Sequence, residues 1–227
     1  MEKWLDTCNK YRVEFDSIDD SVDWYNRTNA TYELERLVEE KNMRRNKYKT
    51  TQSPFNWMND KDMIDTLIVD AMLAGGIDFF CSLPCNMLAG IIRIIDGRDD
   101  LDHIPITREE EGVGIAAGAH LGGKNPAILM QNSGLGNSIN ALLSLTTLYR
   151  MPLLLLMSHR GGRYERIVAQ MPMGDAIIPL LETLGIDYCS IFRRSDIASI
   201  RVFAKDAILK SEIKAVLLQK ELWDEES

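Results

Sequence analysis

The sequence lacks the cysteine and histidine patterns that metal sites and disulfide frameworks require. It has four cysteines and three histidines among 227 residues, and no two cysteines form a Cys-x-x-Cys pair. Scattered thiols of this kind predict neither a zinc site nor a disulfide framework, so we expect no metal on this chain. Reduced thiols fit a cytoplasmic protein best.

Long hydrophobic runs are also absent. The first residues carry no signal-peptide core, and the longest uncharged apolar stretch, residues 151–157, is far too short to cross a bilayer. We therefore expect a cytoplasmic protein without a membrane partner.

The sequence has fewer basic residues than acidic ones. It contains 26 basic and 34 acidic residues, which give a net charge of -8. This balance argues against nucleic acid as a partner.

Two parts of the chain differ in composition. Residues 1–55 are polar and dense in charge, with one passable helical stretch near residues 32–46. We expect them to form a polar N-terminal extension that is partly helical or loosely ordered. In residues 56–227, helical periodicity alternates with short apolar runs bounded by Gly, Pro or Asn, which predicts one α/β domain.

The apolar runs predict the kind of sheet. Residues 127–130 and 153–156 are apolar on both faces, as strands of a parallel sheet covered by helices on both sides must be. The predicted fold is therefore α/β: a doubly wound, mostly parallel six-stranded sheet with helices on both faces. The expected helices are 61–74, 86–95, 109–121, 137–150, 174–184 and 196–210, and the expected strands are 77–82, 103–107, 127–131, 153–158, 187–192 and 214–219.

In such sheets ligands collect at the carboxyl ends of the strands, so chemistry is expected in the loops that follow them. One of these loops, residues 132–137 (NSGLGN), opens a helix, and its glycines let backbone amides approach an anion or merely form a turn. Dinucleotide binding is disfavoured, because a Rossmann site would need a glycine where Ile139 stands.

Three consecutive carboxylates, Glu109, Glu110 and Glu111, begin a predicted helix, where the helix dipole favours negative charge. Such a run is usually a solvated helix start. The helix that follows is nevertheless poor in side-chain bulk, although each glycine costs a helix up to about 1 kcal/mol relative to alanine. These small residues, which predict close packing, are Gly112, Gly114, Ala116, Ala117, Gly118 and Ala119.

A carboxylate that begins a small-residue helix, one sheet position from a glycine-rich segment, resembles the pyrimidine-binding domain of thiamine-diphosphate enzymes. Members of this family include the acetolactate synthases and the phosphonopyruvate and sulfopyruvate decarboxylases. The resemblance covers roughly residues 60–220 and is most specific in 108–119 (REEEGVGIAAGA) and 130–142 (MQNSGLGNSINAL). With 158–161 (SHRG) and 170–174 (QMPMG), the chain is most similar to the alpha subunits of the sulfopyruvate decarboxylases.

The resemblance implies thiamine diphosphate as cofactor, with one catalytic glutamate hydrogen-bonded to a pyrimidine ring nitrogen. That bond favours the imino form, whose exocyclic nitrogen takes the proton from the thiazolium carbon. The register of residues 133–136 (SGLG) puts this glutamate at Glu109, with Glu110 as the fallback. The cofactor-binding residues implied by the resemblance are Glu109, Pro84, Asn132, Ser133, Gly134, Gly136 and Asn137.

The other half of the family's cofactor site is missing from this sequence. These enzymes bind the diphosphate through Mg²⁺ in a further domain, whose signature is Gly-Asp-Gly followed later by Asn. The nearest sequence here, Ile95-Asp96-Gly97, has the wrong first residue and follows a helix. The resemblance therefore implies a chain that is silent alone and requires a beta subunit carrying the diphosphate and Mg²⁺ site.

The segment 159–163 (HRGGR) follows the most apolar strand and concentrates two arginines at its end. They suit a sulfonate, phosphonate or carboxylate, or they pair with surface carboxylates in a solvated loop. By the resemblance, the substrate is 3-sulfopyruvate, converted to sulfoacetaldehyde and CO2 in coenzyme M biosynthesis. Phosphonopyruvate is the competing substrate, and a non-catalytic scaffold subunit of the same fold is the alternative function. The substrate-binding residues expected here are Gln131, His159, Arg160, Arg163 and Gln170.

Overall fold

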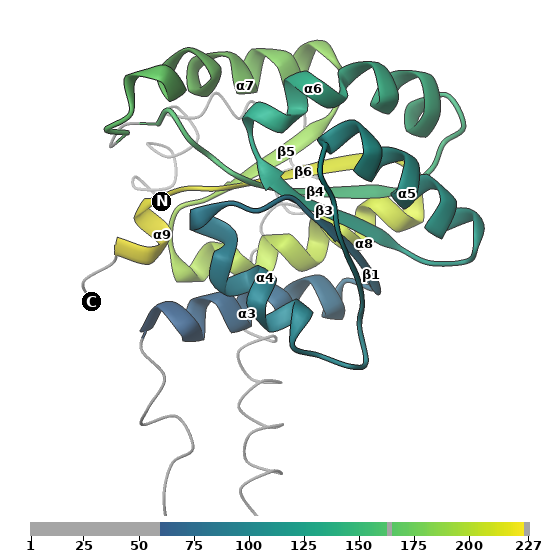
Figure 1. Ribbon diagram of the computed structural model, residues 1–227, viewed down its shortest axis with the longest axis horizontal. Coiled ribbons are helices and arrows are strands. Elements are labelled where there is room, and N and C mark those ends of the chain that lie inside the picture. The colour runs from purple at the N-terminus through teal and green to yellow at the C-terminus, as the bar shows by residue number, and fades with distance from the viewer. Residues whose placement is uncertain (1–59, 163–164, 225–227) are drawn as a thin grey trace, which may run out of the picture. The chain divides into compact units, whose positions relative to one another are not determined.

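The computed structural model of the protein describes residues 60–162 and 165–224. The expected N-terminal extension, residues 1–55, therefore lies outside the described residues, as does Arg163. In the described part, six parallel strands form one sheet in the order β2-β1-β3-β4-β6-β5. Helices cover both faces of this sheet (Figure 1), so the predicted α/β fold class is confirmed.

Strands and helices alternate along the chain. The strands are β1 (Phe79–Ser82), β2 (Asp102–Pro105), β3 (Pro126–Gln131), β4 (Leu153–Ser158), β5 (Asp187–Ile191) and β6 (Ile213–Leu218). The α-helices are α3 (Asp60–Ala74), α4 (Ala89–Asp96), α5 (Glu109–Leu121), α6 (Ser133–Ala141), α7 (Met171–Thr183), α8 (Ala198–Lys210) and α9 (Glu221–Asp224). Short 3-10 turns are η1 (Asn86–Leu88), η3 (Val168–Gln170) and η4 (Arg194–Ile197), and the π-helical η2 (Leu142–Thr147) continues α6. None of these helices is long and apolar enough to cross a membrane.

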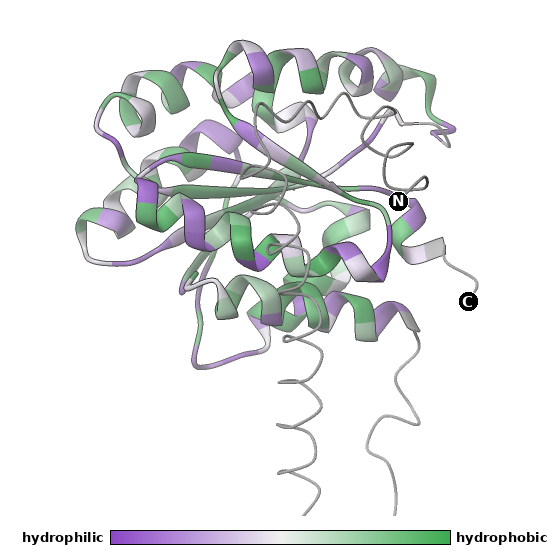
Figure 2. Ribbon diagram, turned by 180° about the vertical axis from the view of Figure 1, so that it is seen from behind, coloured by the Kyte–Doolittle hydropathy of each residue, from purple (hydrophilic) through white to green (hydrophobic). Residues whose placement is uncertain are grey.

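The central strands are buried on both faces, as their unbroken apolar sequences predict. Alternate side chains of β4 enter two separate hydrophobic cores, because successive residues of a strand point to opposite faces. Leu154 and Leu156 pack in the core built with α3, α4 and α8, and Leu153 and Leu155 pack in the core built with α5, α6 and α7. Figure 2 shows the hydrophobic colour running through the central strands, while the helices carry both colours.

The sequence prediction was wrong about where the helix after β3 begins. We expected it to start at residue 137, but α6 begins at Ser133, so the segment 132–137 is mostly the first turn of a helix. One turn further along α6, the hydroxyl of Ser138 donates to the carbonyl oxygen of Gly134. The two glycines favoured a loop on local propensity, and tertiary packing against Gly134 outweighs that cost.

A buried carboxyl joins three helices on the α3 side of the sheet. Asp65 of α3 is fully buried and accepts a hydrogen bond of 2.8 Å from Nε1 of Trp223 in α9. Its second oxygen, Oδ2, lies against Gly90 of α4 and has no hydrogen-bond partner among the described residues. Burial raises the pKa of Asp65, and the Trp223 hydrogen bond and the charge of Lys61 only partly offset this.

We predict that Asp65→Asn changes how stability depends on pH. Because the folded-state pKa of Asp65 lies above its ordinary value, the folded protein binds this proton more tightly than the unfolded chain does. Wild-type stability is therefore expected to fall, relative to the variant, as the pH rises from about 4 toward the raised pKa, and the difference is constant above it. Urea unfolding of both proteins across this range measures the difference, and parallel stability curves would contradict the prediction.

Candidate active site

The carboxyl ends of all six strands lie along one edge of the sheet, because the strands are parallel. Side chains from different loops meet there. Cys85, in the segment after β1, has its Sγ 3.2 Å from the Oγ of Ser158, the last residue of β4. Pro84 in the same segment is exposed. Side chains that follow or end two different strands are thus in contact at this edge of the sheet.

Glu109 is the buried member of the three-glutamate run. It begins α5, is 7% exposed, and its Oε2 accepts a hydrogen bond of 3.0 Å from Nδ2 of Asn137 in α6. Its side chain lies directly on Gly134, where an added Cβ would stand 2.5 Å from Cγ of Glu109 and 2.9 Å from Sδ of Met130. A side chain at position 134 would therefore displace the carboxyl group, so glycine is required there.

The side chains of the other two glutamates contact the residues just before the helix. Glu110 forms an ion pair with the exposed Arg108. Glu111 accepts hydrogen bonds from the backbone N–H (3.2 Å) and the hydroxyl (2.9 Å) of Thr107, and these bonds lower the pKa of Glu111. Glu109 is thus the one carboxylate of the three that is buried and hydrogen-bonded to α6.

The small-residue helix α5 has two different faces. On the inner face Gly112 is buried, and a Cβ there would stand 2.5 Å from Cδ1 of Ile106, so the close packing predicted from the sequence is confirmed on this side. On the outer face Gly114 and Gly118 are exposed and have nothing within 4 Å of an added Cβ. No packing in the described part of the chain accounts for the lack of side chains on that outer face.

Consecutive side chains at the end of β3 bind the segment that follows β4. The amide Nε2 of Gln131 donates to Oγ of Ser133 (2.7 Å) and to Oε1 of Gln170 (2.8 Å). Asn132 is fully buried, and its amide donates to the carbonyl oxygen of Arg160 (2.9 Å) and accepts from the backbone N–H of Arg160 (3.2 Å). Five of the predicted cofactor and substrate residues are therefore linked by hydrogen bonds in two groups, Gln131 with Ser133 and Gln170, and Asn132 with Arg160.

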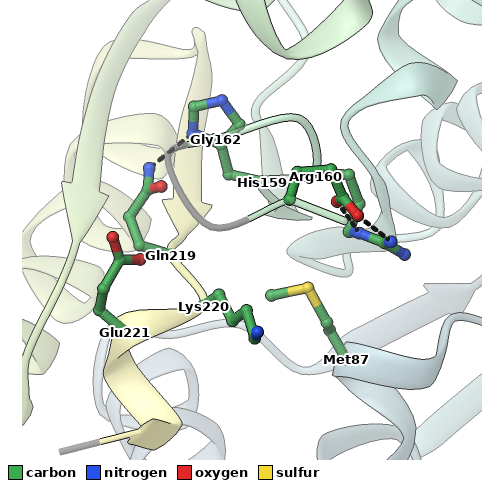
Figure 3. Close-up of a pocket in the computed structure, with 8 residues that line it drawn as sticks. Met87, His159, Arg160, Gly162, Gln219, Lys220 and Glu221 are labelled. Atoms are coloured by element: carbon green, nitrogen blue, oxygen red, sulfur yellow. Dashed lines mark hydrogen bonds and ion pairs between the residues drawn. The ribbon is translucent and has the colours of Figure 1, made fainter. Parts of the chain in front are cut away.

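The predicted substrate residue Arg160 is already paired. Its Nε and Nη2 donate to the two carboxylate oxygens of Glu165 at 2.6 and 2.9 Å, and this ion pair holds the pKa of Glu165 well below its usual range. The pair borders a small pocket (Figure 3). The pocket is lined by Met87, His159, Arg160, Gly162, Glu165, Gln219, Lys220 and Glu221. Two cations and two carboxylates balance one another there, so the pocket is not a simple anion site.

His159 lies on the β6 side of the same pocket (Figure 3). Its Nδ1 accepts a hydrogen bond of 2.6 Å from Nε2 of Gln219, and its Nε2 lies 3.4 Å from the carbonyl oxygen of Gly174. This pattern fits a neutral imidazole protonated on Nε2. Burial lowers the pKa of His159, which agrees with a neutral ring at pH 7.

Sequence reasoning missed Glu165 and Gln219. Gln219 follows the last residue of β6, so the rule that chemistry gathers at strand ends could have found it. Glu165 lies five residues after Arg160 in an irregular segment, and no periodic spacing marks that pair in the sequence. The predicted Gly136 is exposed, with open space around it.

The fold and the geometry define an α/β domain in which a buried glutamate, Glu109, begins a helix at the strand-end edge of the sheet. Residues 63–177 match the family described as thiamine pyrophosphate enzyme, N-terminal TPP binding domain, and the chain belongs to this family.

Similar proteins carry one recurring name. The chain is 43% identical over 159 residues to a sulfopyruvate decarboxylase subunit alpha of Methanothermobacter thermautotrophicus. The aligned region covers 68% of this chain and 96% of that protein. It is 50% identical over 123 residues to the subunit alpha of Methanococcus maripaludis, which covers 54% of this chain and 74% of that protein. A longer sulfopyruvate decarboxylase of Methanosarcina acetivorans is 35% identical over 157 residues, which cover 69% of this chain but 40% of that protein.

A solved structure shares the fold. It is a 2-oxoglutarate:ferredoxin oxidoreductase from Magnetococcus marinus, with a TM-score of 0.52 and 15% sequence identity. The match covers 70% of this chain and 29% of that one, so this chain spans less than a third of the longer protein.

We predict that Gly134→Ala destabilises the protein by about 1–3 kcal/mol, because the new Cβ overlaps the side chains of Glu109 and Met130. Gly114→Ala is the matched control, since position 114 is exposed and helical with open space around it. That control is expected to stabilise by up to about 1 kcal/mol. Urea unfolding followed by circular dichroism measures both, and equal effects of the two substitutions would show that Gly134 is not tightly packed.

Proposed function

We propose that this chain is the alpha subunit of a thiamine-diphosphate-dependent decarboxylase that converts 3-sulfopyruvate to sulfoacetaldehyde and CO2. Family membership and the relatives named sulfopyruvate decarboxylase subunit alpha support this proposal. The observation that carries it is the geometry of Glu109, a buried carboxylate fixed by Asn137 against the backbone of Gly134.

These residues fit the pyrimidine end of thiamine diphosphate. To hydrogen-bond a ring nitrogen, the carboxyl group must be held in one orientation. Among the described side chains, Asn137 alone hydrogen-bonds Glu109, and it uses only one of the two carboxylate oxygens, Oε2. The other oxygen, Oε1, is then the atom that holds the shared proton toward the ring. When bound, thiamine diphosphate supplies the carbon nucleophile and the electron sink for loss of CO2. The proposed cofactor surface is completed by Ser133, Gly136 and Pro84. Asn132 belongs to it as a buried support, because its side-chain amide hydrogen-bonds both backbone groups of Arg160.

We further propose that a beta subunit supplies the diphosphate and Mg²⁺ site. The relatives' designation as alpha subunits supports a partner, and so does the longer Methanosarcina relative, of which this chain covers 40%. The outer face of α5 is suited to close contact with another chain, because Gly114 and Gly118 leave its backbone open. Exposed apolar residues lie on α5 and beyond the adjoining η2, namely Leu121, Leu148 and Tyr149.

At the substrate end we propose the amides of Gln131 and Gln170 as contacts for the 2-oxoacid. They lie at the strand ends, next to the segment that holds Gly134, and their bond to each other fixes their orientation. His159 and the sequence-predicted Arg163 complete the proposed substrate set, whereas the guanidinium of Arg160, predicted with them, is hydrogen-bonded to Glu165. Phosphonopyruvate is the competing substrate, since two phosphonopyruvate decarboxylases are 35% identical over 25–26% of their length.

Substitution of the glutamates tests the proposed role. With the partner subunit present, Glu109→Gln is expected to lower kcat for sulfopyruvate by about 10²–10⁴, the range for a lost proton-transfer group. Glu110→Gln, which alters only the ion pair with Arg108, is expected to change kcat less than about twofold. Steady-state decarboxylation assays measure both. Near-wild-type turnover of Glu109→Gln with loss of activity in Glu110→Gln would move the role to Glu110.

Dependence on the partner is tested by assaying the purified chain alone and with candidate beta subunits. We expect no thiamine-diphosphate-dependent decarboxylation by the chain alone, because the described residues supply only the pyrimidine end of the site. Activity should appear on mixing with a subunit that carries the diphosphate site. Turnover of sulfopyruvate by the lone chain would refute the partner proposal, and no turnover of sulfopyruvate or phosphonopyruvate by any assembly would refute the decarboxylase itself.

A further inference from the structure

We propose that Arg160 and Glu165 are positioning residues whose ion pair places Gln170 for substrate, and that Arg160 does not bind the substrate's anionic head. This inference rests on the proposed function and changes the role expected for Arg160 from the sequence. Four observations on the segment between β4 and α7 carry it.

The carboxylate of Glu165 accepts hydrogen bonds from several residues close to it in the chain. It accepts both hydrogen bonds from the guanidinium of Arg160, at 2.6 and 2.9 Å. It also accepts the backbone N–H groups of Gly161 (3.2 Å), Arg166 (3.0 Å) and Ile167 (2.9 Å). One side chain therefore ties the residues just after β4 to those that lead into η3.

The same segment is packed directly on the start of α7. A Cβ on Gly161 would stand 2.7 Å from Cα of Gly174, and a Cβ on Gly174 would stand 2.5 Å from the carbonyl carbon of Gly161. Gly161 also has a positive φ of 83°, a conformation that favours glycine. The position of Gly161, which Glu165 fixes through a hydrogen bond, thus sets where the first turn of α7 lies.

Gln170 immediately precedes that turn. Its Oε1 accepts the hydrogen bond from Gln131, while Asn132 binds both backbone groups of Arg160. The two ends of the segment are therefore attached to consecutive residues of β3 and the turn after it. Loss of the Glu165 carboxylate would release the connection between these attachments, and the Gln131–Gln170 pair would lose its fixed orientation.

The burial of the ion pair argues against Arg160 as a substrate ligand. The side chain of Glu165 is 8% exposed and that of Arg160 is 18% exposed. An anionic substrate that took over the Arg160 guanidinium would leave the Glu165 carboxylate buried without its cation, which is strongly unfavourable. The pair is thus better suited to hold the backbone than to exchange partners during turnover.

A double-mutant cycle separates the two roles. Glu165→Gln, Arg160→Gln and the double variant are assayed with the partner subunit and thiamine diphosphate. Positioning predicts that each single substitution raises the KM for sulfopyruvate on the order of tenfold to a hundredfold, with a smaller change in kcat. The double variant should be no worse than either single one, because both remove the same connection.

The alternative predicts a different pattern. If Arg160 binds the anionic head, Glu165→Gln frees the guanidinium and leaves KM unchanged or lower. Arg160→Gln then raises KM by the same factor in the wild-type and Glu165→Gln backgrounds. Either result overturns the proposal. Asp206→Asn is the matched control, because it breaks the surface ion pair with Lys210 on α8 and is expected to leave KM within about twofold.

Hydrogen exchange gives a readout that does not depend on activity. In the full-length chain, Glu165→Gln is expected to accelerate exchange of the amides of Gly161, Arg166 and Ile167, and Asp206→Asn should not. Unchanged exchange at these amides overturns the positioning role even if KM rises. If the wild-type assembly shows no decarboxylation, the proposed function fails by itself, and the exchange measurement still tests whether Glu165 positions the segment.

Discussion

The contact between Glu109 and Gly134 is the constraint on which the rest of the site depends. It exists only because position 134 has no side chain, and it brings the first turns of α5 and α6 together at the ends of β2 and β3. The carboxylate keeps a single orientation because Asn137, one turn further along α6, donates to it. Glycine in the first turn of a helix lowers helix stability, and here its missing side chain is what allows the Glu109 carboxyl group to lie against the backbone.

A second set of polar contacts depends on the same short segment. Gln131, Asn132 and Ser133 stand immediately before Gly134. The side chains of Gln131 and Asn132 hydrogen-bond to the segment that leads from β4 to α7, and Ser133 accepts a hydrogen bond from Gln131. Asn132 is buried, and both its amide oxygen and its amide nitrogen are hydrogen-bonded, so it imposes no desolvation penalty of an unpaired group. Residues 131–134 therefore contribute both the glycine on which the Glu109 side chain lies and the amide that donates to Gln170.

The sequence predicted the sheet well because its signal is physical and redundant. Each central strand is apolar on both faces, and two cores on opposite sides of β4 require that pattern. The predicted start of α6 was wrong because local propensity argues against helix at Gly134 and Gly136. The deciding interaction is the packing of Gly134 on Glu109, which is 25 residues away in the chain. The sequence allowed Arg160 to pair with a carboxylate but did not identify Glu165, since the charge of a loop arginine says nothing about which carboxylate lies beside it.

The small residues of α5 lie on two faces of the helix that differ in packing. Gly112 and Ala116 on the inner face are buried against the sheet, so the orientation of Glu109 is set within this chain. Gly114 and Gly118 on the outer face contribute nothing to that packing, and each lowers helix stability by up to about 1 kcal/mol relative to alanine. This loss of helix stability is not balanced by any packing inside the described part of the chain, so we expect these glycines to serve a contact made outside it. Close approach of another backbone to the outer face of α5, where Gly114 and Gly118 have open space, would supply that contact.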